Sequence, residues 1–235
     1  MKNLFFNQTL FKNPVMKNIV IVFALLFSNL IFAQLQKDLG DFDRLKVSDR
    51  IEVRLIQSDK NAIEISGEKS EEVKLITRND QLIIRMETTQ LLQGEDVMIL
   101  LFYKDLKEII ADRGAIIYSE DILKKNKLKI EASKGSEINL SIESEHLEVK
   151  VNSGAEIALK GQAGQQEVIS NSGGNYDGEE LETLFTKVTV NAGGQADIFA
   201  TKNVEAKTRA GGSIHIWGGA EVEQKKVVGG NIRIH

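Results

Sequence analysis

A glycine recurs along the second half of the chain at a nearly constant interval, and this spacing restricts the fold more than any other feature. The intervals between successive members are 21, 19, 19, 20, 18 and 18 residues. A repeat of about 20 residues is typical of a solenoid, because one unit of that length cannot bury its own apolar face. The sequence therefore predicts about seven coils over residues 106–235. The pivot glycines are Gly114, Gly135, Gly154, Gly173, Gly193, Gly211 and Gly229.

The residues on either side of each pivot alternate between apolar and polar, as in Ser213-Ile214-His215-Ile216. A period of two with many β-branched residues indicates strands, not helices. The single proline of the chain is Pro14, which agrees with coils whose backbone N–H groups all feed ladders. Stacking the coils predicts two inward columns. They are Ile117, Ile138, Ile157, Tyr176, Ala196, Ile214, Ile232 and Leu140, Leu159, Ile198, Ile216, Ile234.

We therefore expect an all-β fold. Its architecture should be a right-handed parallel β-helix, that is, a single-stranded β-solenoid. Residues 34–105 contain less regular strands, as an N-terminal β segment or as wider coils. A left-handed β-helix in the C-terminal coils is the alternative, because small or apolar residues recur every six positions from Ala192 to Ile234. The longer spacings before Ala192 break that rule and favour the right-handed form.

A polar column lies two residues before each pivot and includes three consecutive asparagines. Stacked amides one strand spacing apart can hydrogen-bond to one another. The sequence therefore predicts an amide ladder inside this column. Its members are Asp112, Ser133, Asn152, Asn171, Asn191 and Arg209.

Residues 1–33 are typical of a signal peptide. Lys17 precedes an apolar run over residues 19–33, which is too short to span a bilayer comfortably. We expect cleavage after Ala33, with Met16 as an alternative start and an uncleaved anchor helix as the alternative outcome. The mature protein is then exported to the periplasm, the cell surface or the extracellular space, and does not span a membrane.

Composition argues against several classes of site. The chain has no cysteine, which excludes disulfides and thiolate metal sites. Its net charge of −4, without a clustered basic patch, argues against nucleic-acid binding. His146, His215 and His235 lie in different coils, so we expect neither a histidine metal site nor a catalytic triad, and no cofactor. Asp177 and Asp197, in adjacent coils, keep a β-helix carbohydrate-active enzyme as an alternative.

One surface is a candidate for ligand binding. Phe199, Trp217 and His235 share one offset from their pivots. Asp197, His215 and Arg233 precede them by two residues, respectively. An outward row of rings suits a sugar or a partner protein. The alternative is that the rings pack under a loop at the coil corner.

The early strands and the later repeats together resemble the head GIN domain family, usually described as auto-transporter adhesins. The resemblance covers about residues 40–235 and implies an exported β-helix-like fold with no established enzymatic activity and no catalytic residues. The segments that carry it are 42–47, 51–57, 63–67 and 81–84, followed by units such as Asn152-Ser153-Gly154-Ala155 and Asn191-Ala192-Gly193-Gly194.

The leading interpretation is an exported, non-enzymatic adhesin or cell-envelope binding module with a carbohydrate or protein partner at the cell surface. A structural envelope protein is a further alternative. The last coil, residues 231–235, has no polar helix or loop after it, so we also expect that a homo-oligomer can form through this coil.

Overall fold

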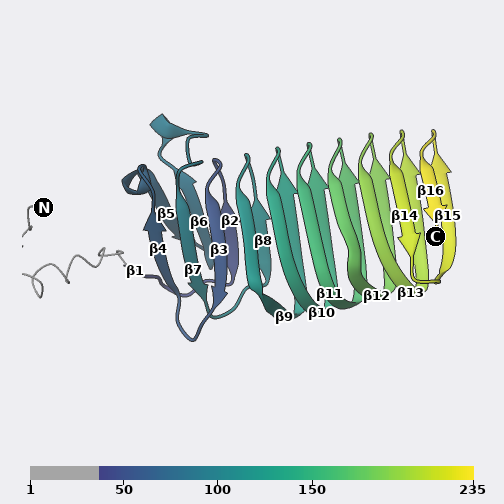
Figure 1. Ribbon diagram of the computed structural model, residues 1–235, viewed down its shortest axis with the longest axis horizontal. Helices are drawn as coiled ribbons and strands as arrows, with labels where there is room; N and C mark the ends of the chain where they lie inside the picture. The colour runs from purple at the N-terminus through teal and green to yellow at the C-terminus, as the bar shows by residue number, and fades with distance from the viewer. Residues whose placement is uncertain (1–36) are drawn as a thin grey trace, which may run out of the picture. The chain divides into compact units, whose positions relative to one another are not determined.

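The computed structural model describes residues 37–235, which form one all-β solenoid of about seven turns (Figure 1). The predicted signal peptide, residues 1–33, and the alternative start at Met16 lie outside the described residues. The regular part of the stack confirms the predicted parallel β-solenoid. Its strands are β9 (Ile116–Ser133), β10 (Glu137–Asn152), β11 (Glu156–Asn171), β12 (Asn175–Asn191), β13 (Gln195–Arg209), β14 (Ser213–Trp217), β15 (Glu221–Val227) and β16 (Asn231–Ile234).

Each long strand follows one coil from a tight corner around a far bend to the next corner. β10 pairs in parallel with β9 on one side and with β11 on the other along nearly its whole length. The corners are the pivots of the sequence repeat. At one of them, Ser153 and Gly154 have φ values of 54° and 69°, a left-handed pair that reverses the chain within a few residues. Glycine enters this conformation without the steric cost that a side chain imposes.

The inward columns lie in register, as predicted. Ile138 pairs with Ile157, Ile157 with Tyr176, and Tyr176 with Ala196, and all four are buried. Ile234 is the exception, because it belongs to the outermost coil and is 53% exposed. Fully burying an aliphatic side chain of this size contributes about 1.5–3 kcal/mol, so each buried position of the columns stabilises the stack.

The six-residue recurrence does not follow one inward column. Ile198 and Ile216 are buried, whereas Ala210 and Val228 occupy corners with positive φ. Val228 is 82% exposed. The spacing that suggested a left-handed helix therefore mixes core and corner positions.

The predicted amide ladder is present. Asn171 Nδ2 donates to Asn152 Oδ1 at 2.7 Å, and Asn191 Nδ2 donates to Asn171 Oδ1 at 2.6 Å. At the start of the same column Ser133 Oγ donates to Asp112 Oδ1 at 3.0 Å. Side chains thus connect neighbouring coils beside the corner, in addition to the backbone ladders.

The first coil does not keep its place in chain order. It consists of β2 (Arg44–Val47) and β3 (Glu52–Gln57). β2 lies between β6 (Gln81–Met86) and β8 (Glu108–Ala111), and β3 lies between β7 (Met98–Tyr103) and β9, all in parallel. The chain therefore builds one coil, then places β6 and β7 outside it, and finally crosses back to continue the stack.

Antiparallel strands cover the outer side of β6 and β7. β4 (Ala62–Ser66) pairs with β7, β5 (Val73–Arg78) pairs with β6, and β1 (Lys37–Asp38) pairs with β4. Short 3-10 turns, η2 (Ser70–Glu72) and η3 (Thr88–Gln90), adjoin these strands. This layer ends the parallel stack on the N-terminal side, where an open edge would otherwise invite pairing.

At the other end, the outer edges of β15 and β16 have no strand partner within residues 37–235. The register places Gln224 beside Ala206 and Lys226 beside Thr208, so two polar side chains occupy inward positions of β15. Charged residues that point inward on an edge strand disfavour the addition of another strand. The addition of a further strand is therefore disfavoured along β15.

Candidate ligand-binding surface

The predicted aromatic row is assembled by the parallel register of the last coils. Phe199 of β13 pairs with Trp217 of β14. His235 follows β16, and its backbone N–H donates to the Ile216 carbonyl at 2.9 Å, which places His235 beside Trp217. Phe199 and Trp217 are half-buried, and His235 is exposed.

The rings of Trp217, His215 and His235 pack against one another. The centroids of Trp217 and His235 are 4.5 Å apart with an interplanar angle of 9°. His215 stacks on both, with centroids 5.9 Å from Trp217 and 5.3 Å from His235. The imidazoles also share a contact of 3.2 Å between His215 Nδ1 and His235 Nε2. Positions along the columns keep the two histidines apart, because His215 pairs with Arg233, and His215 and His235 meet instead on a diagonal between neighbouring coils.

A polar row runs beside the rings. Asp177 pairs with Asp197, Asp197 with His215, and His215 with Arg233. Asp197 Oδ2 accepts from Gln195 Nε2 at 2.8 Å, and Asp177 Oδ1 accepts from the Glu179 backbone N–H at 3.2 Å. Each carboxylate is thus bound to its own strand, and the row changes from acidic to basic along the stack.

A recess of about 360 Å³ opens between the rings and the acidic end of this row. Glu179 and Glu180 line it, and the repeat of the sequence did not predict either residue there. The remaining lining residues are Asp177, Phe199 and Trp217.

A bulge in β12 brings the two glutamates into this recess. Gly178 pairs with Ile198, but Glu182 already pairs with Phe199, so β12 carries three extra residues at this point. Leu181 turns into the core, and its neighbours Glu179 and Glu180 lie outside. The signal in the sequence was the pivot interval, which is 20 residues for this coil and 18 for the next.

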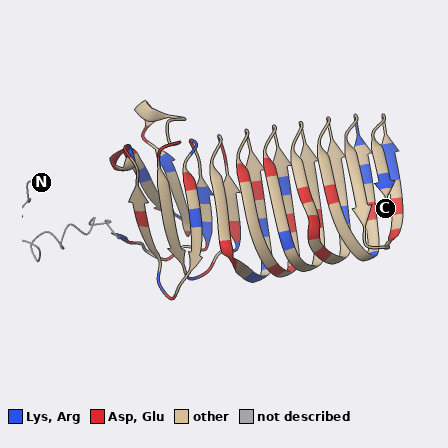
Figure 2. Cartoon of the chain, in the orientation of Figure 1, with Lys and Arg blue, Asp and Glu red and all other residues tan. Residues whose placement is uncertain are grey.

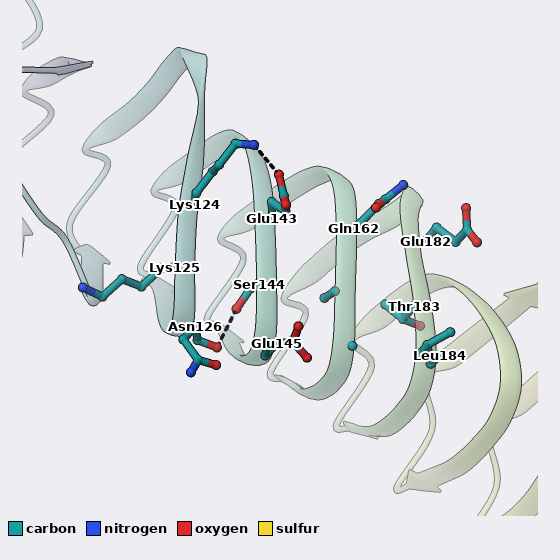
Figure 3. Close-up of a pocket in the computed structure, with 12 residues that line it drawn as sticks. Lys124, Lys125, Asn126, Glu143, Ser144, Glu145, Gln162, Glu182, Thr183 and Leu184 are labelled. Carbon is teal, nitrogen blue, oxygen red and sulfur yellow. Dashed lines mark hydrogen bonds and ion pairs between the residues drawn. The ribbon is translucent and has the colours of Figure 1, made fainter.

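A second recess of about 590 Å³ crosses the far bends of β9 to β12 (Figure 3). Small side chains such as Ser144 and Ala163 line its floor. Lys124 Nζ lies 2.6 Å from Glu143 Oε2, and Lys125 pairs with Asp105, whereas Glu145 and Glu182 have no ion-pair partner within residues 37–235. No aromatic ring lines this recess, unlike the one beside Phe199 and Trp217.

A third recess, of about 780 Å³, lies beside β9 and is lined by several basic residues. Three of these charges are balanced by carboxylates: Lys107 pairs with Asp43, Lys125 with Asp105, and Lys129 with Glu108. The hydrogen bond from Lys129 to Glu108 raises the pKa of the lysine. Bands of both charge signs are interspersed over the whole stack (Figure 2).

Within residues 37–235, no three or more His, Asp or Glu side chains gather where they could hold a metal ion. None of the helices in this part of the chain is long and apolar enough to cross a bilayer.

Residues 41–220 match the family described as "putative auto-transporter adhesin, head GIN domain". The chain belongs to this family. The match excludes the last coil, so His235 and Arg233 lie beyond the part that the head GIN domain defines. A comparison with curated protein sequences finds no match.

Several solved structures have the same fold. A putative adhesin from Bacteroides fragilis NCTC 9343 is 18% identical over 85% of this chain and 95% of its own, with a TM-score of 0.76. A putative adhesin from Parabacteroides merdae ATCC 43184 is 19% identical over 85% and 94%, with a TM-score of 0.69. A putative lipid binding protein from Parabacteroides distasonis ATCC 8503 is 15% identical over 84% and 95%, with a TM-score of 0.66. At these identities the likeness concerns the fold.

Proposed function

We propose that this head GIN domain protein is an exported, non-enzymatic binding module of the cell envelope, which holds a carbohydrate against Phe199 and Trp217. The observation that carries the proposal is the recess in which these two rings face three carboxylates. Family membership and the adhesin descriptions of the structural neighbours support a role in adhesion.

The two sides of the recess suit the two kinds of surface that a sugar presents. Aromatic rings pack on its apolar C–H face, and the carboxylates of Asp177, Glu179 and Glu180 accept hydrogen bonds from its hydroxyl groups. Ligand sites of this kind combine apolar contact area with a few polar groups that fix orientation. A neutral or cationic glycan fits better than an anionic one, because the lining contains no basic side chain.

The arrangement of Asp177 and Asp197 favours binding over hydrolysis. Glycosidases place two carboxyl groups on either side of the scissile bond. Here the two aspartates are register partners on one face of the sheet, so both would approach a bound sugar from the same side.

A glycan array combined with a hydrolysis screen tests the proposal. We expect retention of a glycan without release of products, and a change in the fluorescence of Trp217, the only tryptophan. Trp217→Ala should abolish retention, whereas Phe185→Ala, at an exposed phenylalanine of another surface, should leave it unchanged. Product release, or retention that survives Trp217→Ala, would overturn the proposal.

Export is tested separately by the N-terminus of protein recovered from its host. The apolar run after Lys17 favours cleavage after Ala33, so we expect the mature chain to begin at Gln34 and to fractionate outside the cytoplasm. An unprocessed chain in the cytosol would contradict this part of the proposal.

A further inference from the structure

We propose that His215 and His235 together bind a divalent transition-metal ion on the outer face of the last coils. The two imidazoles come from β14 and from the residue after β16, and their Nδ1 and Nε2 atoms are 3.2 Å apart. His235 is exposed and His215 is half-buried, so an ion can reach both nitrogens from solvent.

The separation of the nitrogens fits shared coordination. Imidazole nitrogen binds zinc at about 2.0–2.1 Å, so two cis ligands at angles between square-planar and tetrahedral lie about 2.9–3.3 Å apart. The observed 3.2 Å falls within that range. Parallel strand pairing fixes the backbones on both sides, because β14 and β16 are in register from Ser213 to Ile216.

The pair has no competing partner. Within residues 37–235, the one hydrogen bond to either imidazole is the contact that they share. That bond requires a proton on one of the facing nitrogens. In the other tautomer the same ring carries this proton on its second nitrogen, so both facing nitrogens then have a free lone pair for a metal ion. Water would occupy the remaining positions of the ion.

The ligand type indicates which ions would bind. Imidazole suits zinc, copper and nickel, and among divalent first-row ions affinity is highest for Cu²⁺. Charges nearby have both signs: Asp197 and Arg233 are the register neighbours of His215 on either side. Affinity should therefore follow the order Cu²⁺, then Ni²⁺ and Zn²⁺, whereas Mg²⁺ and Ca²⁺, which prefer oxygen ligands, should not bind here.

Trp217 provides a reporter for this site. Its ring lies against His235 with 4.5 Å between centroids, and it is the only tryptophan of the chain. Bound Cu²⁺ quenches tryptophan fluorescence at such short range. Metal binding does not require a glycan, so this inference and the proposed function can fail independently.

The experiment is a titration of the purified protein, without an affinity tag, with Cu²⁺, Zn²⁺ and Mg²⁺. Equilibrium dialysis measures stoichiometry, and Trp217 fluorescence follows occupancy by Cu²⁺. We expect one Cu²⁺ per chain, and His215→Ala and His235→Ala should each weaken binding by at least about tenfold. His146→Ala, at the third histidine, should leave binding unchanged.

Electron paramagnetic resonance of the unaltered protein with one equivalent of Cu²⁺ keeps the test independent of how the variants fold. Hyperfine coupling to two imidazole nitrogens is the expected result. Coupling to one nitrogen or none would overturn the proposal. The proposal would also be overturned if both histidine variants bound Cu²⁺ as tightly as the unaltered protein. The same holds if the unaltered protein bound no more Cu²⁺ than a histidine-free protein, because His215 and His235 would then form a hydrogen bond and no metal site.

Discussion

Asn191 donates to Oδ1 of Asn171, but its own Oδ1 is buried and accepts no hydrogen bond within residues 37–235. The next position of the column is Arg209, which pairs with Asn191 in the strand register and is exposed. The amide ladder therefore ends at Asn191 with an acceptor that has no donor, because position 209 does not supply another amide. An unsatisfied buried polar atom costs about 1–3 kcal/mol.

Extending the ladder should stabilise the protein. In Arg209→Asn, the new amide would lie one strand spacing from Asn191 and could donate to its free Oδ1, which predicts a gain of about 0.5–1.5 kcal/mol in the free energy of unfolding. Urea denaturation measures the change. Arg209→Ala is the control, because it removes the same charge without adding a donor, and an equal gain in both variants would contradict the ladder explanation.

Successive side chains of a strand point to opposite faces, so we expect substitutions at neighbouring positions to have very different effects on stability. Ile157 and Ile214 are fully buried, so truncation of either to alanine should cost about 2–5 kcal/mol. Glu156 is exposed and Ser213 is half-buried, and their replacement by alanine should change stability by about 0.5 kcal/mol or less. Denaturant melts that found equal losses at both sets would contradict the register.

The regular coils could be predicted from the sequence because an inward residue occurs at the same distance from each pivot glycine. Ile138, Ile157 and Tyr176 are both repeats in sequence and neighbours in space. The N-terminal end follows a different rule. β6 pairs with β2 outside the order of the chain, through contacts between residues such as Leu45 and Leu82. Local periodicity contains no information about that pairing.

The candidate site was predictable in part for the same reason. Phe199 and Trp217 share an offset from their pivots, and the register places them side by side. Glu179 and Glu180 were missed because the extra residues of a bulge have no counterpart in the next coil. The contact between His215 and His235 was missed because side chains on neighbouring strands can also meet diagonally.

Tyr103 should make stability fall at alkaline pH. Burial, assisted by the negative charges of Asp121 and Asp105, raises its pKa to about 12 from 10.0. A folded-state pKa above the unfolded value favours folding fully below pH 10, and this contribution is lost as the pH rises towards 12. The free energy of unfolding should therefore be smaller at pH 11 than at pH 8.

Tyr103→Phe should reduce that alkaline dependence without weakening the fold at neutral pH. The Tyr103 hydroxyl is buried and has no hydrogen-bond partner within residues 37–235, so its removal should leave stability unchanged or raise it by about 1 kcal/mol. Part of the dependence should remain, because burial also raises the pKa of Tyr176. An undiminished difference between pH 8 and pH 11 in the variant would exclude Tyr103 as a cause.

Asp49 should be the most sensitive polar residue of the N-terminal end. Its buried carboxylate accepts from Arg113 Nε at 2.7 Å and from the Met86 backbone N–H at 3.2 Å. It thereby joins the corner of the first coil to the end of β6 and to the corner before β9. The Arg113 side chain is 35% exposed and also lies 3.5 Å from Asp112, so the loss of Asp49 should cost less than the ~3–5 kcal/mol that is typical of breaking a fully buried ion pair.

Asp49→Ala and Asp49→Asn separate the charge from the geometry. Asp49 has a φ of 68°, a left-handed conformation that costs less for asparagine than for alanine. Asp49→Asn retains an acceptor for Met86 and should cost less than Asp49→Ala, which loses the acceptor, the charge and the favourable backbone. Native-state hydrogen exchange should show the loss first in β6 and β7, since they lie outside the first coil and depend on this connection. Exchange that accelerated equally in β13 would instead indicate that the whole stack unfolds as one unit.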